Sequence, residues 1–113
     1  MQDALIQSHS VVMLATTGET LVGCAVAWLI EDELQLLDIA VHPKYRRQGY
    51  GIYLLKALVT AAKSRGCTTA ILEVSEHNAA AVQLYVQLGF QQVHVRRAYY
   101  KDGADALLMN MCL

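Results

Sequence analysis

Three apolar runs joined by short polar turns dominate the first 41 residues, and they constrain the fold most. The runs cover residues 11–15, 21–30 and 34–41, and the turns between them cover residues 16–19 and 31–33. Apolar, β-prone runs bounded by such turns predict strands, and short turns join neighbouring strands in antiparallel order. We therefore expect an antiparallel meander of three strands in this part of the chain.

The hydrophobic period becomes helical from Ile52 onward. Apolar side chains then recur at helical spacing, at Leu54, Leu55, Leu58, Val59 and Ala62. Gly66 is expected to end this helix, and Asn78 and Gly89 to bound a second one, because Asn caps helix N-termini and Gly follows their C-termini. The remaining β-prone runs predict three more strands, over residues 68–74, 90–95 and 106–111. This order of elements indicates a mixed α/β fold.

Composition excludes several classes of protein. The chain has 113 residues, of which 55% are hydrophobic and 17% charged. It can therefore bury a core as one domain over residues 1–113, and it is not disordered. Its net charge of −1 gives no bulk attraction to nucleic acid or to anionic lipid, so we expect neither as a partner. The longest apolar run, residues 21–30, is too short for a membrane span.

The cysteines and histidines indicate no metal site and no disulfide framework. Cys24, Cys67 and Cys112 are odd in number and widely spaced, with no CxxC pair. This usage is typical of a reducing compartment, so we expect a cytoplasmic protein. The histidines are scattered along the chain, at His9, His42, His77 and His94.

A glycine-containing loop lies between the third strand and the first helix. It reads Arg46-Arg47-Gln48-Gly49-Tyr50-Gly51. Unpaired N–H groups at a helix N-terminus, together with the helix dipole and two arginines, can hold a phosphate group. The G-x-G pattern is weak by itself, and an ordinary strand-to-helix turn is an equally good interpretation. The loop lacks the Lys-Ser/Thr of a Walker sequence and the third glycine of a dinucleotide fingerprint.

The surroundings of this loop resemble a known motif. Ile39-Ala40-Val41-His42-Pro43, then Tyr45 to Gly51 and Leu54-Leu55, is similar to the acetyl-CoA motif of the GCN5-related N-acetyltransferases (GNAT). The resemblance implies a mixed, mostly antiparallel sheet with helices on both faces, and a cofactor-binding core over about residues 34–90. It implies acetyl-CoA as acetyl donor, held by loop amides and by the edge of a splayed strand. The implied cofactor-binding residues are Ile39, Ala40, Val41, Arg46, Arg47, Gln48, Gly49, Tyr50, Gly51, Ile52 and Asn78.

The second half of the chain resembles one subfamily of these acetyltransferases. The segments Leu72-Glu73-Val74, Asn78-Ala79-Ala80-Ala81, Leu84-Tyr85 and Leu88-Gly89-Phe90 are similar to the bacterial ribosomal-protein alanine N-acetyltransferases (the RimI type). So is Val95-Arg96-Arg97-Ala98-Tyr99-Tyr100 with the residues that follow it. The likeness runs from about Leu34 to the C-terminus. It implies transfer of an acetyl group to an N-terminal alanine of a ribosomal protein, without an acyl-enzyme.

The resemblance assigns chemical roles to two side chains. Glu73 would be the general base, acting through a water, and Tyr85 the acid that protonates the departing thiolate. The Val41 N–H would stabilise the oxyanion, and Asn78 would hold the pantetheine arm. Without the resemblance, Glu73 reads as a solvated strand-end carboxylate, Tyr85 as a core residue, and Asn78 as a plain helix cap.

A basic-aromatic stretch, formed by Arg96, Arg97, Tyr99 and Tyr100, has three interpretations. Arginine beside tyrosine can stack on single-stranded nucleic acid, or it can be a strand edge with alternating faces. The resemblance implies a third, in which Arg97 and Tyr99 form a wall of the groove that receives the acceptor. This chain has Ala98 where the subfamily usually has Asn, so recognition of the peptide can differ.

The family normally has a strand and a helix ahead of the segment that matches residues 5–7, and this sequence lacks them. The sequence therefore predicts an N-terminally truncated GNAT fold, either from a late start or from a short member that completes itself by association. We expect the apolar surface around residues 21–30 to be bare and to form a homodimer. Rival functions are the same chemistry on a small amine or a lysine, and a non-catalytic acyl-CoA-binding module.

Overall fold

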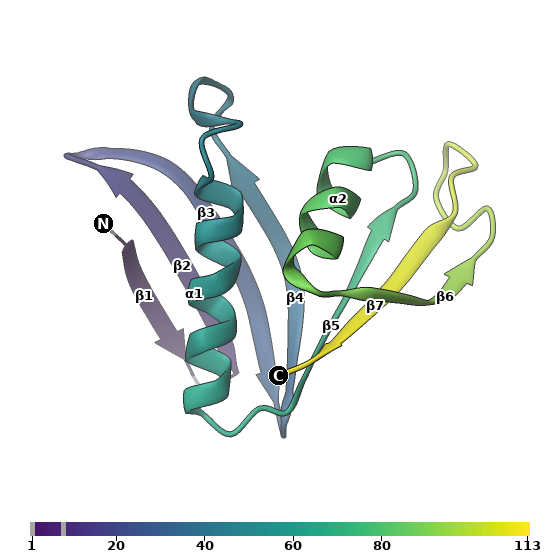
Figure 1. The fold of residues 1–113 in the computed structure, drawn as a ribbon, viewed down its shortest axis with the longest axis horizontal. Helices are drawn as coiled ribbons and strands as arrows, with labels where there is room; N and C mark the ends of the chain where they lie inside the picture. The colour runs from purple at the N-terminus through teal and green to yellow at the C-terminus, as the bar shows by residue number, and fades with distance from the viewer. Residues whose placement is uncertain (1, 8) are drawn as a thin grey trace.

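Seven strands form one sheet in the order β1-β2-β3-β4-β5-β7-β6, with two helices packed on it (Figure 1). The computed structural model describes residues 2–7 and 9–113. The strands are β1 (Gln2–Gln7), β2 (Ser10–Thr17), β3 (Thr20–Ile30), β4 (Glu33–Val41), β5 (Thr69–Ser75), β6 (Gln91–Arg96) and β7 (Ala106–Cys112). The helices are α1 (Tyr50–Ser64) and α2 (Ala79–Leu88), and a short 3₁₀ turn, η1 (Pro43–Tyr45), precedes α1.

The element order from β2 onward is the one that the sequence predicted. All neighbouring strands are antiparallel except β4 and β5, so the sheet is mixed and mostly antiparallel, as expected. Strand β1 was not predicted, and it pairs with β2 from Gln2↔Ala15 to Gln7↔Ser10. Its only apolar run is residues 4–6, which is too short to indicate a strand without a partner, so pairing with β2 decides its conformation.

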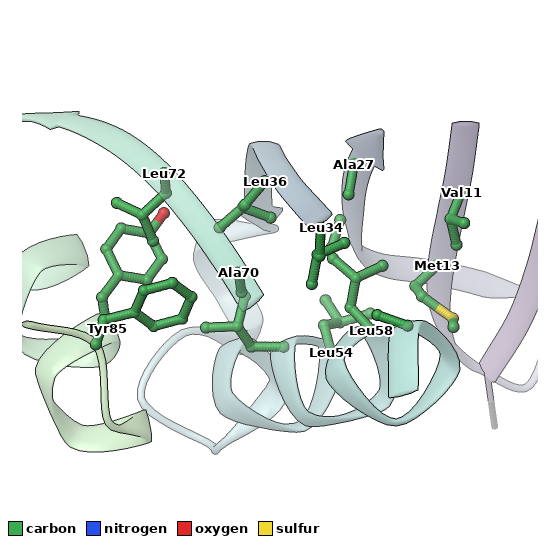
Figure 2. Packing of buried hydrophobic residues seen from close by; sticks show 14 of the residues in the cluster. Val11, Met13, Ala27, Leu34, Leu36, Leu54, Leu58, Ala70, Leu72 and Tyr85 are labelled. Atoms are coloured by element: carbon green, nitrogen blue, oxygen red, sulfur yellow. The ribbon is translucent and has the colours of Figure 1, made fainter. Parts of the chain in front are cut away.

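The hydrophobic core lies between one face of the sheet and the two helices. Val11, Met13 and Ala15 alternate with half-buried residues along β2, as expected for a strand with one packed face. Helix α1 buries Leu54 and Leu58 against this face. Figure 2 shows these side chains pointing toward one another across the helix–sheet boundary.

Both helices cover the same face of the sheet, which corrects the expected cover on two faces. On β5, Leu72 points toward Tyr85 of α2 (Figure 2), while Ala70 lies on the same face near α1. Among the described residues no helix covers the opposite face, which we call the open face. It leaves large apolar side chains 40–47% exposed at Trp28, Ile30 and Leu37. The bare apolar surface expected near residues 21–30 is therefore present.

Cys24, Cys67 and Cys112 are free thiols, and burial is the main cause that raises the pKa of Cys67 above its ordinary value. Neither α1 nor α2 is long and apolar enough to cross a membrane.

Strand β4 offers a matched pair of leucines for testing the two faces. Leu34 is 2% exposed in the core, whereas Leu37 is 47% exposed on the open face. We expect Leu34→Ala to lower the free energy of unfolding by about 2–5 kcal/mol, because it leaves a cavity. Leu37→Ala should change it by no more than about 0.5 kcal/mol, because it removes little buried area. Urea unfolding of both variants measures the difference, and equal losses would contradict the one-sided core.

Candidate active site

The sheet opens between β4 and β5, where the pairing is parallel. Pairing is limited to Glu33–Gln35 on β4 and Thr69–Ile71 on β5. Directly after these pairs the register between β3 and β4 shifts, between Val26 and Ala27. A bulge of this kind bends a strand, so β4 departs from β5 while it remains paired with β3. Residues 36–41 therefore carry a free backbone edge, and Figure 1 shows the two strands diverging there.

The backbone of Val41 faces this opening. The His42 N–H donates to the Val22 carbonyl at 2.8 Å, so the preceding pair, Val41 and Gly23, is of the kind that exchanges no hydrogen bonds. The Val41 N–H and carbonyl consequently point away from β3. Arg46 Nε donates to that carbonyl at 3.1 Å. The Val41 N–H, which is the predicted oxyanion donor, therefore faces the opening, and by alternation the Ile39 N–H points the same way.

Free backbone amides line the loop that follows β4. The first helical hydrogen bond of α1 runs from the Tyr53 N–H to the Gly49 carbonyl, at 3.0 Å. Within the part of the chain that the structure describes, no acceptor takes a hydrogen bond from the N–H groups of residues 47–52. Such a row of donors at a helix N-terminus is an anion site. The loop keeps its shape with Arg47 at a φ of 62° and Gly49 at 86°, both left-handed.

The two loop glycines have different reasons to be glycine. A Cβ on Gly49 would meet nothing within 4 Å, so its positive φ is what favours glycine. A Cβ on Gly51 would lie 3.3 Å from Leu84 of α2. Glycine at position 51 therefore also allows close packing of α1 on α2.

Side chains of the predicted cofactor loop mostly brace the loop itself. Gln48 Nε2 donates to the Lys44 carbonyl at 3.2 Å, and the Tyr50 hydroxyl lies 3.2 Å from Thr17 Oγ1. Arg47 is exposed, and its guanidinium forms no ion pair with a described side chain. Arg46 uses only its Nε at Val41, so both arginines keep N–H groups that an anion can bind.

Tyr85 reaches the site from the covered face. It is 6% exposed, and its ring meets Phe90 edge-on at a centroid distance of 5.9 Å. Burial, and to a smaller extent the charge of Asp38, raises the pKa of Tyr85 above its ordinary value of 10. The phenol is therefore neutral at pH 7 and can donate a proton. Asp38 is a neighbour that the sequence reasoning did not connect with Tyr85.

Glu73 reaches the site from the open face, because it follows Leu72 on β5 and successive strand residues alternate. Its Oε1 accepts from the Tyr100 hydroxyl at 3.5 Å, and its Oε2 lies 3.9 Å from Arg96 Nη1. The structure thus places Glu73 and Tyr85 on opposite sides of the same strand. Arg96 and Tyr100 are partners that sequence reasoning missed, although their membership of the basic-aromatic stretch was a usable signal.

The other predicted site residues lie near the same end of the sheet. Asn78 Oδ1 accepts from the Ala81 N–H at 3.3 Å, so Asn78 caps α2, as the plain interpretation had it. Arg97 Nη1 lies 3.8 Å from Asp105 Oδ2, with 87% of its side chain exposed. Tyr99 is 52% exposed and therefore free to meet a ligand.

A shallow cavity of about 390 Å³ adjoins Glu73 on the open face. Apolar side chains make most of its wall, and two charged groups stand in its lining. Its principal residues are Leu37, Ile71, Glu73, Val93, Arg96 and Leu108. The base candidate therefore faces a recess that an acceptor molecule can enter.

Comparisons with known proteins establish the family of this chain. The model of the acetyltransferase (GNAT) family matches residues 1–90. The [ribosomal protein bS18]-alanine N-acetyltransferase of Escherichia coli strain K12 is 42% identical over 97 residues, which cover 83% of this chain and 66% of that relative. The chain thus spans slightly less than two thirds of the length of this relative.

Solved structures show the same fold. The crystal structure of the ribosomal-protein-S18-alanine N-acetyltransferase from Escherichia coli matches with a TM-score of 0.88 and 37% identity, covering 95% of this chain and 71% of that one. The crystal structure of nourseothricin acetyltransferase matches with a TM-score of 0.85 and 30% identity, covering 93% and 66%. Because the family model matches residues 1–90, which are most of the chain, this chain belongs to the acetyltransferase (GNAT) family.

Proposed function

We propose that this chain moves an acetyl group from acetyl-CoA to a primary amine, by direct transfer in a ternary complex. The observation that carries the proposal is the opening between β4 and β5. It joins a free strand edge and a row of free amides to Tyr85 on one face and Glu73 on the other. A donor molecule and an acceptor can therefore approach the same point from opposite faces of the sheet.

The donor would occupy the loop and the strand edge. The N–H groups of residues 47–52, with the guanidinium of Arg47, suit the pyrophosphate of acetyl-CoA. The pantetheine arm contains amides, which suit the outward N–H and carbonyl groups of Ile39. The Val41 N–H would be kept for the oxyanion, and the Val41 carbonyl already accepts from Arg46. Ala40 contributes the backbone between Ile39 and Val41. Asn78 would use its amide N–H₂, because its Oδ1 is already engaged by the Ala81 N–H.

The side chains on the two faces would divide the proton transfers. Glu73 would take the proton of the acceptor amine through a water, and the C–N bond would form as the C–S bond breaks. An α-amino group has a pKa of about 7.7–8.0, so this deprotonation costs little at neutral pH. The Val41 N–H would stabilise the charge on the carbonyl oxygen. Tyr85, held neutral by burial, would supply the proton that the departing thiolate takes up.

The best candidate for the acceptor is the N-terminal alanine of a ribosomal protein. The supporting observation is the 42% identity with an enzyme named for that reaction. A small amine is the second candidate, supported by the fold likeness to nourseothricin acetyltransferase at 30% identity. Arg97 and Tyr99 are exposed beside the opening and would form the wall that contacts the acceptor. We place the reaction in the cytoplasm, since all three cysteines are free thiols.

Homodimer formation through the open face belongs to the same proposal. Trp28 and Ile30 are exposed there, and a net charge of −1 opposes association only weakly. We expect light scattering to show a dimer that Trp28→Glu dissociates, because the new charge would be buried. Glu19→Gln serves as a surface control, since Glu19 lies in an exposed turn. A wild-type monomer at high concentration would contradict this part of the proposal.

Replacing the proposed acid tests the chemistry. Tyr85→Phe keeps the packing against Phe90 but removes the hydroxyl, and we expect kcat to fall about 10²- to 10⁴-fold. The assay follows thiol release from acetyl-CoA with a peptide that begins with alanine. Tyr53→Phe is the matched control, because Tyr53 is an exposed tyrosine on α1. Full turnover by Tyr85→Phe would remove the acid from the mechanism.

The same tyrosine predicts a dependence on alkaline pH. The fold favours the neutral phenol, so its contribution to stability is present below about pH 10 and is lost as pH rises through the raised pKa. We expect wild-type protein to lose stability more steeply than Tyr85→Phe above about pH 10. Urea unfolding at a series of pH values measures this, and parallel curves for both proteins would contradict it.

A further inference from the structure

The side chains of Glu73, Arg96, Tyr99 and Tyr100 form a closed ring of contacts. Arg96 Nη1 lies 3.9 Å from Glu73 Oε2, and the Tyr100 hydroxyl donates to Glu73 Oε1 at 3.5 Å. The guanidinium carbon of Arg96 lies 5.4 Å from the centroid of the Tyr99 ring. Tyr99 in turn meets Tyr100 edge-on, with ring centroids 5.2 Å apart. Each of the four therefore contacts two others.

Strand register, rather than sequence proximity, brings Arg96 to Glu73. Arg96 is the last residue of β6 and pairs with Ala106 of β7. Ala106 pairs on its other side with Ser75, which lies two residues after Glu73 on β5. Paired residues share a face and so do residues two apart on a strand, so Arg96 lies on the same face as Glu73.

The turn that carries the two tyrosines is itself held in place. The Ala98 N–H donates to Asp105 Oδ1 at 2.8 Å, with Ala98 at a φ of 49°. The Tyr100 N–H donates to the Ala104 carbonyl at 3.2 Å. These hydrogen bonds connect the turn to the residues just before β7, so the backbone that carries the rings of Tyr99 and Tyr100 is held in place.

We propose that Arg96 is a positioning residue for the acetyl transfer, acting through Glu73. This inference rests on the proposed function, in which Glu73 takes the proton of the amine. Arg96 holds one carboxylate oxygen while Tyr100 holds the other, which fixes the plane of the carboxylate. The Tyr99 ring fixes the guanidinium in turn. Arg96 thus couples the orientation of the base to the wall that receives the acceptor.

Kinetics of Arg96 variants test this coupling. Arg96→Gln keeps much of the side-chain length but removes the charge, and we expect kcat to fall roughly tenfold or more, since small misplacements of a catalytic group are costly. The KM for acetyl-CoA should not change, because the donor binds on the other side of β5. Arg96→Lys should recover part of the loss. Arg65→Gln, at the far end of α1, is the control and should match wild type.

A double-mutant cycle separates positioning from a structural role. In a Glu73→Gln background, Arg96→Gln should cause no further loss of kcat, because its action requires the carboxylate. Independent losses that multiply would overturn the inference. So would an Arg96→Gln variant that turns over normally while wild type is active.

A spectroscopic measurement keeps the inference testable without turnover. The NMR signal of the Arg96 Nε–H should be shifted by the Tyr99 ring current, and Tyr99→Leu should abolish that shift. Glu73→Gln should move the same signal by freeing the guanidinium. An Arg96 signal that responds to neither change overturns the inference. If the signal responds but no amine is acetylated, the proposed function fails while the coupling of Arg96 to Glu73 stands.

Discussion

The departure of β4 from β5 is the feature on which the rest of the site depends. Their parallel pairing spans residues 33–35 and 69–71 alone, and the register shift next to Ala27 bends β4 away. A parallel pair that continued would have consumed the outward N–H and carbonyl groups of Val41. Because the strands separate, the Val41 N–H faces the opening and its carbonyl accepts from Arg46.

The two faces of the sheet give the proposed acid and base different surroundings. Tyr85 is packed among apolar side chains on the covered face, and this burial raises its pKa. Glu73 is partly exposed on the open face, where Arg96 and Tyr100 contact it. Burial keeps the phenol of Tyr85 protonated, whereas the carboxylate of Glu73 is open to solvent. Strand β5 thus separates the buried surroundings of Tyr85, the proposed acid, from the exposed surroundings of Glu73, the proposed base.

The shape of the loop over residues 46–51 depends on its contacts with β4, α1 and α2. The left-handed conformation of Gly49 precedes α1, and its position leaves the first helical amides without acceptors. Arg46 is engaged at the end of β4, so the loop is fixed to the strand edge where the rest of a long donor would lie. Gly51 allows α2 to approach α1 closely, which brings the helix that carries Tyr85 to the opening. The loop therefore links three parts of the site.

The sequence by itself determined the elements from β2 onward, because alternating and helical periods, Gly66, Gly89 and Asn78 are local signals. It also indicated the loop and the candidate pair Glu73 and Tyr85, through a resemblance that spacing alone could not supply. Tertiary structure decided what depends on pairing between distant segments. Strand β1 forms by pairing with β2, and both helices pack on one face of the sheet. Arg96 lies close to Glu73 because β7 pairs with both β6 and β5. These contacts follow from register and burial, which no single segment of the chain encodes.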